Sequence, residues 1–596
     1  MLRGTRPFSF MKSFRRRLHA KVAKGVGAHI TQKVTISRQT RTECAIYVMR
    51  PQKKFAFHGY LCYLCVTKGI MRMRELKYPV GMATFSELIT KGYAYVDKTA
   101  YIGRLLDQGK FIFMSRPRRF GKSLLLSTLE SYFEGRRELF KGLAADSMDL
   151  DWTPSPVLHF DFNAENFSLE DGLELLLDGL LRDYERIYGK HTEDITPSRR
   201  FRVLIEAAYR QTGREVVILI DEYDKPLLDI EDNRVLFEKN QRILKSFFGN
   251  LKSMDRYIRF VFITGVARFS KVSIFSDLNN LDDISIVDEY ADICGWSEQE
   301  LIGTFRAGIQ TLADKRKEDF ETTLKKLRDY YDGYLFTEEG SRLYNPFSIL
   351  KALKNKRIDP YWFVSGTPTF LARRIKNMRI FPQDINGQTC TRKELIAVGL
   401  NDRNPVPLMF QTGYLTIGRH VPDTDSYILR FPNQEVEEGF YEELLQVFLP
   451  DTSNPFSPFS FSLFRMDLLE GRPEGFMKRM GTLLKDLPYE DHNESTYRAV
   501  TFLLTVLSGT PALAERHGYK GRSDLEVFAG KNIYIFEFKY NKSVKEAMDQ
   551  ILSRDYAGRY ALDPRTVYLI AANFNETKED RHLSYEILQL SESEPE

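Results

Sequence analysis

The stretch from Phe111 to Phe133, FIFMSRPRRFGKSLLLSTLESYF, carries the clearest pattern in this chain. A short apolar run is followed by a tight polar loop that ends in Gly121-Lys122-Ser123, and a leucine-rich helical pattern begins at once. This order of strand, loop and helix is typical of a phosphate-binding loop, in which backbone N–H groups and the helix N-terminus attract phosphate. We therefore expect Gly121, Lys122 and Ser123 to bind nucleotide, with Lys122 as a point charge on the phosphates and the Ser123 hydroxyl as a ligand of Mg²⁺.

The loop departs from the usual phosphate-binding pattern at its first position, where Arg116 replaces a glycine. Residues 115–120 read SRPRRF, which is a stiffer and more cationic segment than such loops usually have. The flanking strand and helix nevertheless favour nucleotide binding, and we include Arg119 among the nucleotide-binding residues. The alternative is a basic surface turn that precedes an ordinary core helix.

A second element carries an acidic pair at the end of an apolar run. Residues 216–220 read VVILI and are followed by Asp221-Glu222-Tyr223-Asp224. Continuous apolar runs suit parallel strands that are buried on both faces. In the Walker B role, Asp221 holds Mg²⁺ through water and Glu222 polarises the attacking water. The alternative is a solvated strand end.

A third apolar run, at 260–263, ends in Thr264-Gly265. Thr264 stands where a polar side chain could sense the γ-phosphate, so we add it to the nucleotide-binding residues. Arg268 follows closely and could contact phosphate or could be a surface charge. The three apolar runs together predict an α/β fold with a parallel sheet.

Six long segments of the chain, in this order, carry a family resemblance. They read YPVGMATFSELITKGYAYVDKT (78–99), RPRRFGKSL (116–124), LIDEYDKPL (219–227), TGVARFSKVSIFSDLNNLDDIS (264–285), YNPFSIL (344–350) and FQTGYLTI (410–417). The chain thereby resembles the bacterial AAA-ATPase-like family, which is usually fused to a C-terminal PD-(D/E)XK nuclease-like domain. Since that family itself carries RPRRFGKS, the resemblance implies that the missing glycine is a family trait. It also implies a P-loop NTPase with an additional-strand sheet that binds ATP with Mg²⁺, followed by a helical region.

The C-terminal part of the chain contains a predicted β-hairpin with two carboxylates and a lysine. Residues 521–540 read as two strands joined by a turn at 529–532. A hairpin centred on that turn places Asp524 opposite Glu537, with Cβ atoms roughly 4.5–5.5 Å apart. Lys539 shares a face with Glu537, because side chains alternate along a strand. The three side chains are therefore expected to converge.

This convergence predicts a catalytic centre. Two carboxylates, Asp524 and Glu537, can hold Mg²⁺, and Lys539 can orient or activate the attacking water. The D…ExK pattern is that of the PD-(D/E)XK nuclease superfamily. The alternative is a half-exposed hairpin with a cross-strand charge cluster, although opposed like charges are unfavourable unless a cation lies between them.

The sequence around the hairpin fits the same interpretation. Apolar residues at helical spacing predict an amphipathic helix over 544–552, and a strand is expected at 567–571. Upstream, Glu494 precedes an apolar helix at 497–507. Glu494 could supply a further acidic ligand, or it could simply favour the start of that helix.

The chain is long enough for several domains. Its 596 residues correspond to about four domain-sized units. We divide it into a basic extension at 1–76, an AAA-ATPase-like domain at 77–295, a helical middle region at 296–480 and a nuclease-like domain at 481–596. The many aromatic residues of the middle region are expected in its core more often than as platforms for base stacking.

The amino-acid composition limits which cellular compartment and which cofactors we expect. No run of 18 apolar residues predicts a membrane span. The five cysteines fit a reducing compartment, and we expect a cytoplasmic location. Cys62 and Cys65 form one CxxC motif without a second pair, which argues against a zinc site.

The net charge of +5 conceals an uneven distribution. Residues 1–76 contain 17 Lys/Arg and 2 Asp/Glu, whereas the rest of the chain contains 69 basic and 79 acidic residues. The body is therefore mildly acidic, and its global charge does not indicate nucleic acid. The basic segment could be a targeting segment, a nucleic-acid arm or upstream sequence from a wrong start codon. We favour the last, with Met71 or Met73 as the start.

These observations together predict an ATP-binding and ATP-hydrolysing protein with a coupled Mg²⁺-dependent nuclease-like domain that acts on nucleic acid phosphodiesters. ATP occupancy is expected to change the arrangement of the two ends. One alternative is a non-catalytic, ATP-switched scaffold that binds nucleic acid or protein, and another is an ATPase whose nuclease fold only binds. We expect no membrane partner. The sequence leaves open the choice between DNA and RNA and allows an oligomer.

Overall fold

We describe a computed structural model of the chain, which divides into two compact units at Met1–Leu76 and Lys77–Glu596. In the first unit, strands β1 (Lys33–Thr35) and β2 (Ala45–Tyr47) pair antiparallel. Both candidate sites lie in the second unit. The described residues are 33–35, 45–47 and 76–590, apart from 164, 190–195, 231–232, 270–272, 276–277, 279, 364–368, 397–403, 450–457, 485–492, 519 and 578–580.

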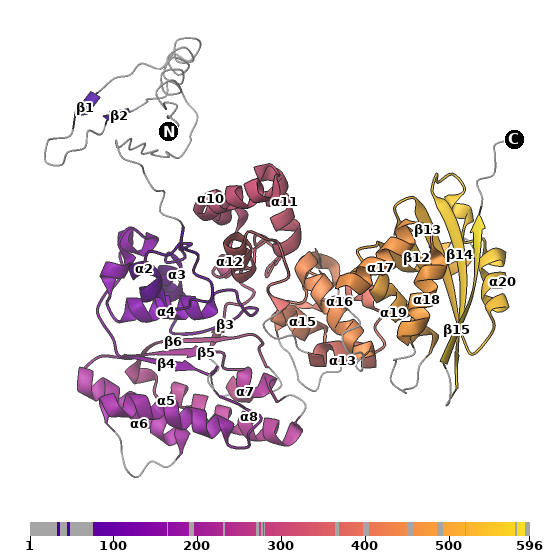
Figure 1. Cartoon of the computed structure of the whole chain (residues 1–596). Helices are drawn as coiled ribbons and strands as arrows, with labels where there is room; N and C mark the ends of the chain where they lie inside the picture. Colours follow the sequence, from indigo (N-terminus) through magenta and orange to yellow (C-terminus); the bar gives the residue numbers. More distant parts are fainter. Residues whose placement is uncertain are drawn as a thin grey trace, which may run out of the picture. The chain divides into compact units, whose positions relative to one another are not determined.

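A five-stranded parallel sheet forms the centre of the N-terminal part of the second unit (Figure 1). Its strands are β3 (Phe111–Ser115), β4 (Val157–Asp161), β5 (Val216–Asp221), β6 (Ile258–Gly265) and β7 (Asp282–Asp283). They run in the order β4-β5-β6-β3-β7, so β6 lies between the strand before the phosphate loop and the strand before the acidic pair. This order confirms the predicted additional-strand sheet, and it brings the carboxyl ends of β3, β5 and β6 to one edge.

Helices cover both faces of this sheet (Figure 1). One face carries α2 (Phe85–Thr90), α3 (Tyr101–Gln108) and α4 (Lys122–Phe133), and the other carries α5 (Gly172–Tyr188), α6 (Pro197–Thr212) and α8 (Arg234–Phe248). Every residue of β5 is buried, as expected for an apolar strand between two helical layers. The short helix α7 (Lys225–Leu228) follows the acidic end of β5.

The middle region is mainly helical, as predicted, but it also contains a small sheet that the sequence did not suggest. Its helices include α10 (Glu298–Arg316), α11 (Phe320–Tyr331), α12 (Pro346–Asn355), α13 (Thr369–Asn377), α15 (Val406–Thr412) and α16 (Gln434–Phe448). The sheet consists of β8 (Thr389–Thr391), β9 (Thr416–Val421) and β10 (Ser426–Arg430), in the antiparallel order β8-β10-β9. A capping box at Ser297 and Glu300 satisfies the first backbone N–H groups of α10 and so fixes where that helix begins.

The C-terminal region is a second five-stranded sheet with helices on its two faces. Its strands, β11 (Ala512–Gly518), β12 (Gly521–Ala529), β13 (Asn532–Tyr540), β14 (Thr566–Glu576) and β15 (Arg581–Leu590), lie in sequence order. The pair β13 and β14 is parallel, and the other pairs are antiparallel. The helices are α17 (Pro458–Leu469), α18 (Pro473–Leu483), α19 (Glu494–Leu507) and α20 (Val544–Arg554).

The predicted hairpin register is confirmed, since Leu525 pairs with Phe536 and Val527 with Tyr534. The predicted order of hairpin, helix and strand is also confirmed, whereas β11 and β15 were not foreseen. Both of these outer strands carry many polar side chains, which weaken the period-two signal.

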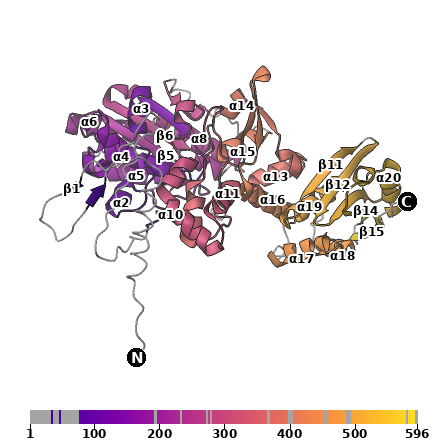
Figure 2. The ribbon, with the colours of Figure 1, turned by 90° about the horizontal axis from the view of Figure 1, so that it is seen from above.

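The middle and C-terminal regions share a packed interface. Helix α16 contacts α19, and the two helices lie side by side in Figure 2. The ring of Phe502 on α19 contacts Tyr441 (centroids 6.0 Å apart) and Phe381 (5.4 Å). Gln383 exchanges hydrogen bonds with the backbone of Ala514 at 2.6 and 3.3 Å. In the described part of the chain, none of the helices is both long and apolar enough to cross a membrane.

Candidate functional site

The phosphate loop turns sharply into α4. Gly121 has φ of +98°, in the left-handed region where glycine is unstrained. Lys122 is the first residue of α4, and its Nζ donates to the carbonyl oxygens of Arg116 (2.9 Å) and Pro117 (3.1 Å). The ammonium therefore lies inside the curve of the loop, where the sequence pattern places phosphate. Ser123 follows and lines the same pocket as Lys122.

The two acidic residues at the end of β5 have different surroundings. Asp221 is buried, and its Oδ1 accepts a hydrogen bond from the Thr264 hydroxyl at 2.5 Å. Glu222 instead lines the pocket with Lys122. Burial raises the pKa of Glu222, and the charge of Lys122 partly counteracts that rise. Of the predicted residues, Arg119, Gly121, Lys122, Ser123 and Glu222 line one pocket, whereas Asp221 and Thr264 bond to each other and are not among the described residues that line it.

Glu222 has an unusual backbone conformation. Its φ of +53° is in the left-handed region, which costs a non-glycine residue roughly 1–2 kcal/mol. Such strain is typical of residues whose position serves a site rather than the fold. No local sequence pattern indicates this left-handed conformation of Glu222.

Two further residues at this edge have structural partners. Asp224 Oδ2 accepts from the backbone N–H groups of Val266 (2.8 Å) and Ala267 (2.6 Å), and burial raises the pKa of Asp224 to about 6. Arg268 forms an ion pair with Asp283 and is not one of the described residues that line the pocket. Arg268 is therefore engaged beside the sheet rather than in the pocket.

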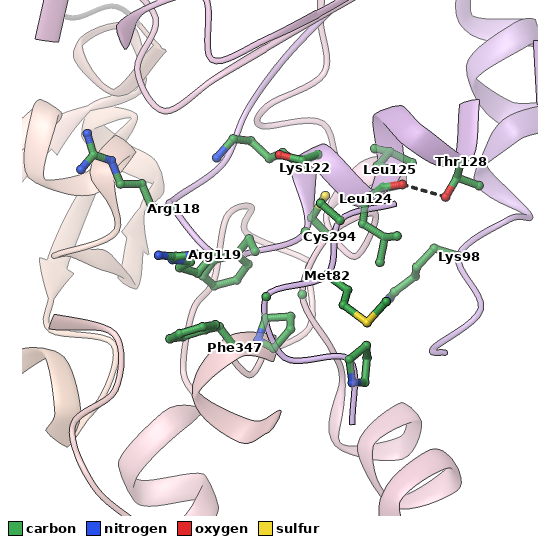
Figure 3. Close-up of a pocket in the computed structure, with 18 of the residues that line it drawn as sticks. Met82, Lys98, Arg118, Arg119, Lys122, Leu124, Leu125, Thr128, Cys294 and Phe347 are labelled. Atoms are coloured by element: carbon green, nitrogen blue, oxygen red, sulfur yellow. Dashed lines mark hydrogen bonds between the residues drawn. The ribbon is translucent and has the colours of Figure 1, made fainter. Parts of the chain in front are cut away.

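The pocket beside the loop has a volume of about 630 Å³, within the range of small-molecule sites. It is lined by residues between 79 and 98, by the phosphate loop and α4, by the ends of β4 and β5, by 293–296 and by the start of α12. Figure 3 shows the cations of the loop toward one side, and the apolar side chains of Met82, Leu124 and Leu125 toward the other. A cationic side next to an apolar side suits a phosphate chain attached to a planar base.

Asp161 is a pocket residue that the sequence analysis missed. It ends β4 directly beside Asp221 in the parallel register, and it lines the pocket. Burial raises the pKa of Asp161. The segment VLHFD at 157–161 repeats the pattern of an apolar strand that ends in an acid, which was the available signal.

Arg116, at the position of the missing glycine, anchors the loop. Its guanidinium is buried and donates to the carbonyl oxygens of Ser285 (2.7 Å) and Tyr290 (2.9 Å). It also lies over the ring of Phe336, 4.4 Å from the centroid. Burial lowers the pKa of Arg116. This arginine therefore binds the protein rather than phosphate.

Aromatic residues of the middle region contact the phosphate loop. Phe120 contacts the rings of Tyr334 (4.7 Å) and Phe336 (5.5 Å). Trp362 Nε1 donates to the carbonyl oxygen of Arg118 at 3.1 Å. These rings belong to the buried core, as the sequence analysis expected of the middle region, and they also fix the phosphate loop.

A close backbone approach completes this enclosure. Gly413 has φ of +89°, and a Cβ atom there would lie 2.6 Å from the Cβ of Pro117. Glycine is therefore required at this point of FQTGYLTI. The segments that resemble the family in the middle region are thus parts of the phosphate-loop environment.

The second candidate centre lies on β12 and β13. Asp524 Oδ2 accepts from the backbone N–H of Phe538 at 2.8 Å. Lys539 Nζ contacts Glu537 Oε1 at 2.8 Å and donates to the carbonyl oxygen of Phe538 at 3.1 Å. Glu537 is almost fully buried, and its Oε2 has no hydrogen-bond partner among the described residues. The structure therefore gathers Asp524, Glu537 and Lys539, as predicted from the register.

The acidic side chains around Asp524 affect one another's pKa values. Burial and the charge of Asp524 raise the pKa of Glu537 to about 7, although Lys539 opposes the shift. Glu494 is the first residue of α19, and burial and Asp524 raise its pKa too. Glu494 is thus both a helix-start residue and a member of the acidic surroundings of Asp524.

Arg498 is the residue of this centre that the sequence analysis missed. Its Nη1 lies 3.3 Å from Asp524 Oδ1 and 2.6 Å from Glu515 Oε1. Arg498 follows Glu494 by one helical turn, so both side chains project from the same face of α19. That spacing was the available signal.

Comparison with known proteins agrees with this geometry. Residues 79–275 match the family described as Predicted AAA-ATPase, and residues 492–582 match the PD-(D/E)XK nuclease superfamily. A relative from Azotobacter chroococcum mcd 1, "Uncharacterized protein in vnfD 5'region", is 33% identical over 517 residues, which cover 84% of this chain and 97% of that protein. The chain belongs to the AAA-ATPase-like family with a C-terminal PD-(D/E)XK nuclease superfamily domain.

The donor atoms of the PD-(D/E)XK domain fit a magnesium ion. Among the described residues, no cluster of three or more His, Cys, Asp and Glu has metal-binding geometry. Mg²⁺, however, is often held by one or two carboxylates and several waters. The unpartnered Oε2 of Glu537, next to Asp524, is the kind of buried oxygen that such a cation would satisfy. In the AAA-ATPase-like region, the Ser123 hydroxyl and the Asp221 carboxylate are suitable oxygen donors.

A first prediction concerns the anchor of the loop. Replacing Arg116 by Met should lower the free energy of unfolding of this region by about 2–4 kcal/mol, because the change leaves buried carbonyl groups unpaired. The measurement is thermal unfolding by scanning calorimetry without nucleotide. The exposed Arg186 offers a matched control, and Arg186→Met should change stability by less than about 0.5 kcal/mol. Equal melting temperatures for Arg116→Met and wild type would contradict the anchoring role.

A second prediction concerns Glu537. Its pKa of about 7 in the folded state lies above the value of about 4.3 expected in the unfolded chain, so the folded state binds this proton more tightly. The resulting stabilisation is complete at low pH and is lost as the pH rises through 7. Without Mg²⁺, the wild type should therefore lose stability relative to Glu537→Gln between pH 5 and 8, by at most roughly 3 kcal/mol. A melting-temperature difference that stays constant over this range would show that Glu537 does not titrate there.

Proposed function

We propose that the AAA-ATPase-like region hydrolyses ATP in the pocket beside the phosphate loop. The observation that carries this proposal is the meeting of Lys122, Ser123 and Glu222 around one pocket of about 630 Å³. Lys122 would exchange its two loop carbonyl contacts for phosphate oxygens. Mg²⁺ held by Ser123, and through water by Asp221, would neutralise charge on the phosphates.

Glu222 is the proposed base. A water oxygen forms a bond to the γ-phosphorus while the bond from that phosphorus to the β–γ bridging oxygen breaks, and ADP leaves with the electron pair. Glu222 orients this water and takes its proton, which then passes to the phosphate product. The raised pKa of Glu222 suits a base that must accept a proton near neutrality.

We further propose that the PD-(D/E)XK domain hydrolyses phosphodiesters of nucleic acid. Asp524 and Glu537 would hold Mg²⁺, which supplies charge stabilisation at the scissile phosphate. Lys539, already 2.8 Å from Glu537, would hold the attacking water. The oxygen of that water bonds to phosphorus while the bond to one ester oxygen breaks, the leaving oxygen takes the electron pair, and the proton lost by the water reaches the leaving oxygen through solvent.

Coupling between the two activities is proposed to pass through α16 and α19. Glu435 at the start of α16 accepts from the backbone N–H of Trp362 at 2.7 Å, and Trp362 contacts the phosphate loop. α16 packs on α19, which carries Arg498 beside Asp524. A change in the loop on nucleotide binding therefore has a continuous set of contacts to the second centre.

One observation favours an alternative in which the second centre does not cleave. The guanidinium of Arg498 lies at Asp524 Oδ1, where a metal ion would otherwise find a free oxygen. If Arg498 neutralises Asp524 permanently, the chain is an ATP-switched scaffold whose PD-(D/E)XK fold binds nucleic acid or protein. Cleavage assays and metal titrations distinguish these functions.

A third prediction tests the ATPase site. Lys122→Ala should abolish ATP binding measured by calorimetry, because the phosphate-binding cation is lost. Glu222→Gln should retain ATP binding and lower the turnover number by at least about 100-fold, since the isosteric amide cannot accept the proton. Asp224→Asn removes a buried carboxylate from the same edge and serves as the comparison. If Asp224→Asn stops turnover while Glu222→Gln does not, the base is misassigned.

A fourth prediction tests the second centre. In the full-length protein, Asp524→Asn, Glu537→Gln and Lys539→Ala should each abolish Mg²⁺-dependent cleavage of mixed DNA and RNA substrates. Calorimetric titration should show at least about tenfold weaker Mg²⁺ binding for the two carboxylate variants. Lys539→Ala should bind Mg²⁺ almost as wild type does, because lysine is not a ligand.

The exposed carboxylate of Asp549 on α20 provides the control for this series, and Asp549→Asn should leave cleavage and Mg²⁺ binding unchanged. If Asp524→Asn and Glu537→Gln bind Mg²⁺ like the wild type, the two carboxylates do not form one metal site. The scaffold alternative would then be the better account of the C-terminal domain.

A further inference from the structure

The cations that line the nucleotide pocket differ in their partners. Lys98 contacts Glu300 Oε1 at 2.6 Å, and Lys225 bonds to Asn163. Lys122 bonds to two loop carbonyl groups. The side chains of Arg118 and Arg119 also line the pocket, but their guanidinium groups have no hydrogen-bond or ion-pair partner among the described residues. These two arginines are therefore available to a ligand.

The two arginines have different surroundings. The guanidinium of Arg119 lies over the ring of Phe347, 4.7 Å from its centroid, and the residue is exposed. Burial raises the pKa of Glu222 and of Asp229, and the charge of the half-buried Arg118 opposes both rises. Like Lys122, Arg118 is therefore a cation whose charge acts at the proposed base.

The backbone of Arg118 is fixed from outside the loop. Its carbonyl oxygen accepts the Trp362 indole N–H at 3.1 Å. Trp362 is itself held by the Glu435 carboxylate, which accepts from the backbone N–H of Trp362 at 2.7 Å. The indole also contacts the ring of Tyr414, with centroids 5.1 Å apart. Because Trp362 is buried and held by these contacts, its hydrogen bond fixes the backbone of Arg118. It thereby sets the position from which the Arg118 side chain extends.

We propose that Arg118 contacts the γ-phosphate and stabilises the charge that develops on it during transfer, and that Trp362 is the positioning residue that sets Arg118 at this place. This proposal rests on the proposed ATP hydrolysis. Many NTPases receive such an arginine from a second protein, and its contribution is roughly 10³–10⁵ in turnover number. Here the phosphate loop itself would supply it. The extra cation of RPRRFGKS then has a catalytic role, whereas Arg116 has a structural one.

The test compares binding of two nucleotides to the full-length protein. Arg118→Ala should bind ADP within about twofold of wild type, but should bind the non-hydrolysable β,γ-imido analogue of ATP at least about tenfold more weakly. Its turnover number should fall by at least about 100-fold. Arg118→Lys should restore part of the analogue affinity. Arg119→Ala should instead weaken ADP and the analogue by similar factors, because the guanidinium of Arg119 lies over the ring of Phe347.

Trp362→Phe keeps an aromatic ring at this position but removes the indole donor and part of the buried volume. Alone, this change should lower the melting temperature because it leaves a cavity, and it should lower the turnover number about tenfold with ADP affinity unchanged. Combined with Arg118→Ala, it should cause no further loss, because its effect passes through Arg118. A general structural role for Trp362 would instead give multiplying losses in the double variant.

The outcomes separate this inference from the proposed function. If the wild type binds neither nucleotide, the ATPase proposal itself fails. If the wild type binds ATP but Arg118→Ala binds the analogue and ADP in the wild-type ratio, only the role of Arg118 is overturned. Because the binding comparison needs no hydrolysis, it decides the role of Arg118 even for a protein with slow turnover.

Discussion

The buried guanidinium of Arg116 is the contact on which the proposed nucleotide site depends. A charged group in a protein interior requires hydrogen bonds, and the two Nη atoms of Arg116 donate to the carbonyl oxygens of Ser285 and Tyr290. These bonds tie the loop after β3 to the chain after β7. Phe120 of the loop contacts the aromatic core of the middle region, and Trp362 of that region bonds to the loop. A loop without its first glycine thus obtains its shape from neighbours rather than from backbone freedom.

This arrangement makes the middle region part of the proposed nucleotide site. The start of α12 lines the pocket, Gly413 lies against Pro117, and Trp362 bonds to the loop. The same region continues into α16, whose contact with α19 reaches the centre around Asp524. The two sites are therefore connected by packed helices rather than by a linker, and a disturbance at either site has a mechanical route to the other.

Local sequence patterns predicted the strands, turns and helices that carry both sites. Features that depend on contacts between distant residues could not be predicted from these patterns. The apolar strands, the Gly-Lys-Ser turn and the hairpin register of Asp524 and Glu537 follow from short-range periodicity and from turn position. The left-handed backbone of Glu222 and the pairing of Arg498 with Asp524 depend on residues distant in sequence. The outer strands β11 and β15 were missed because their polar side chains conceal the alternation.

The position of β6 between β3 and β5 has a consequence for chemistry. Neighbouring strands lie about 4.8 Å apart, so the strand that leads to Lys122 and the strand that ends at Asp221 are separated by roughly 10 Å. That gap between backbones is wider than the distance between the charged atoms of an ion pair. The inserted strand therefore acts as a spacer. It sets apart the segments that follow β3 and β5, so that Lys122 and Glu222 reach one pocket from different strand ends.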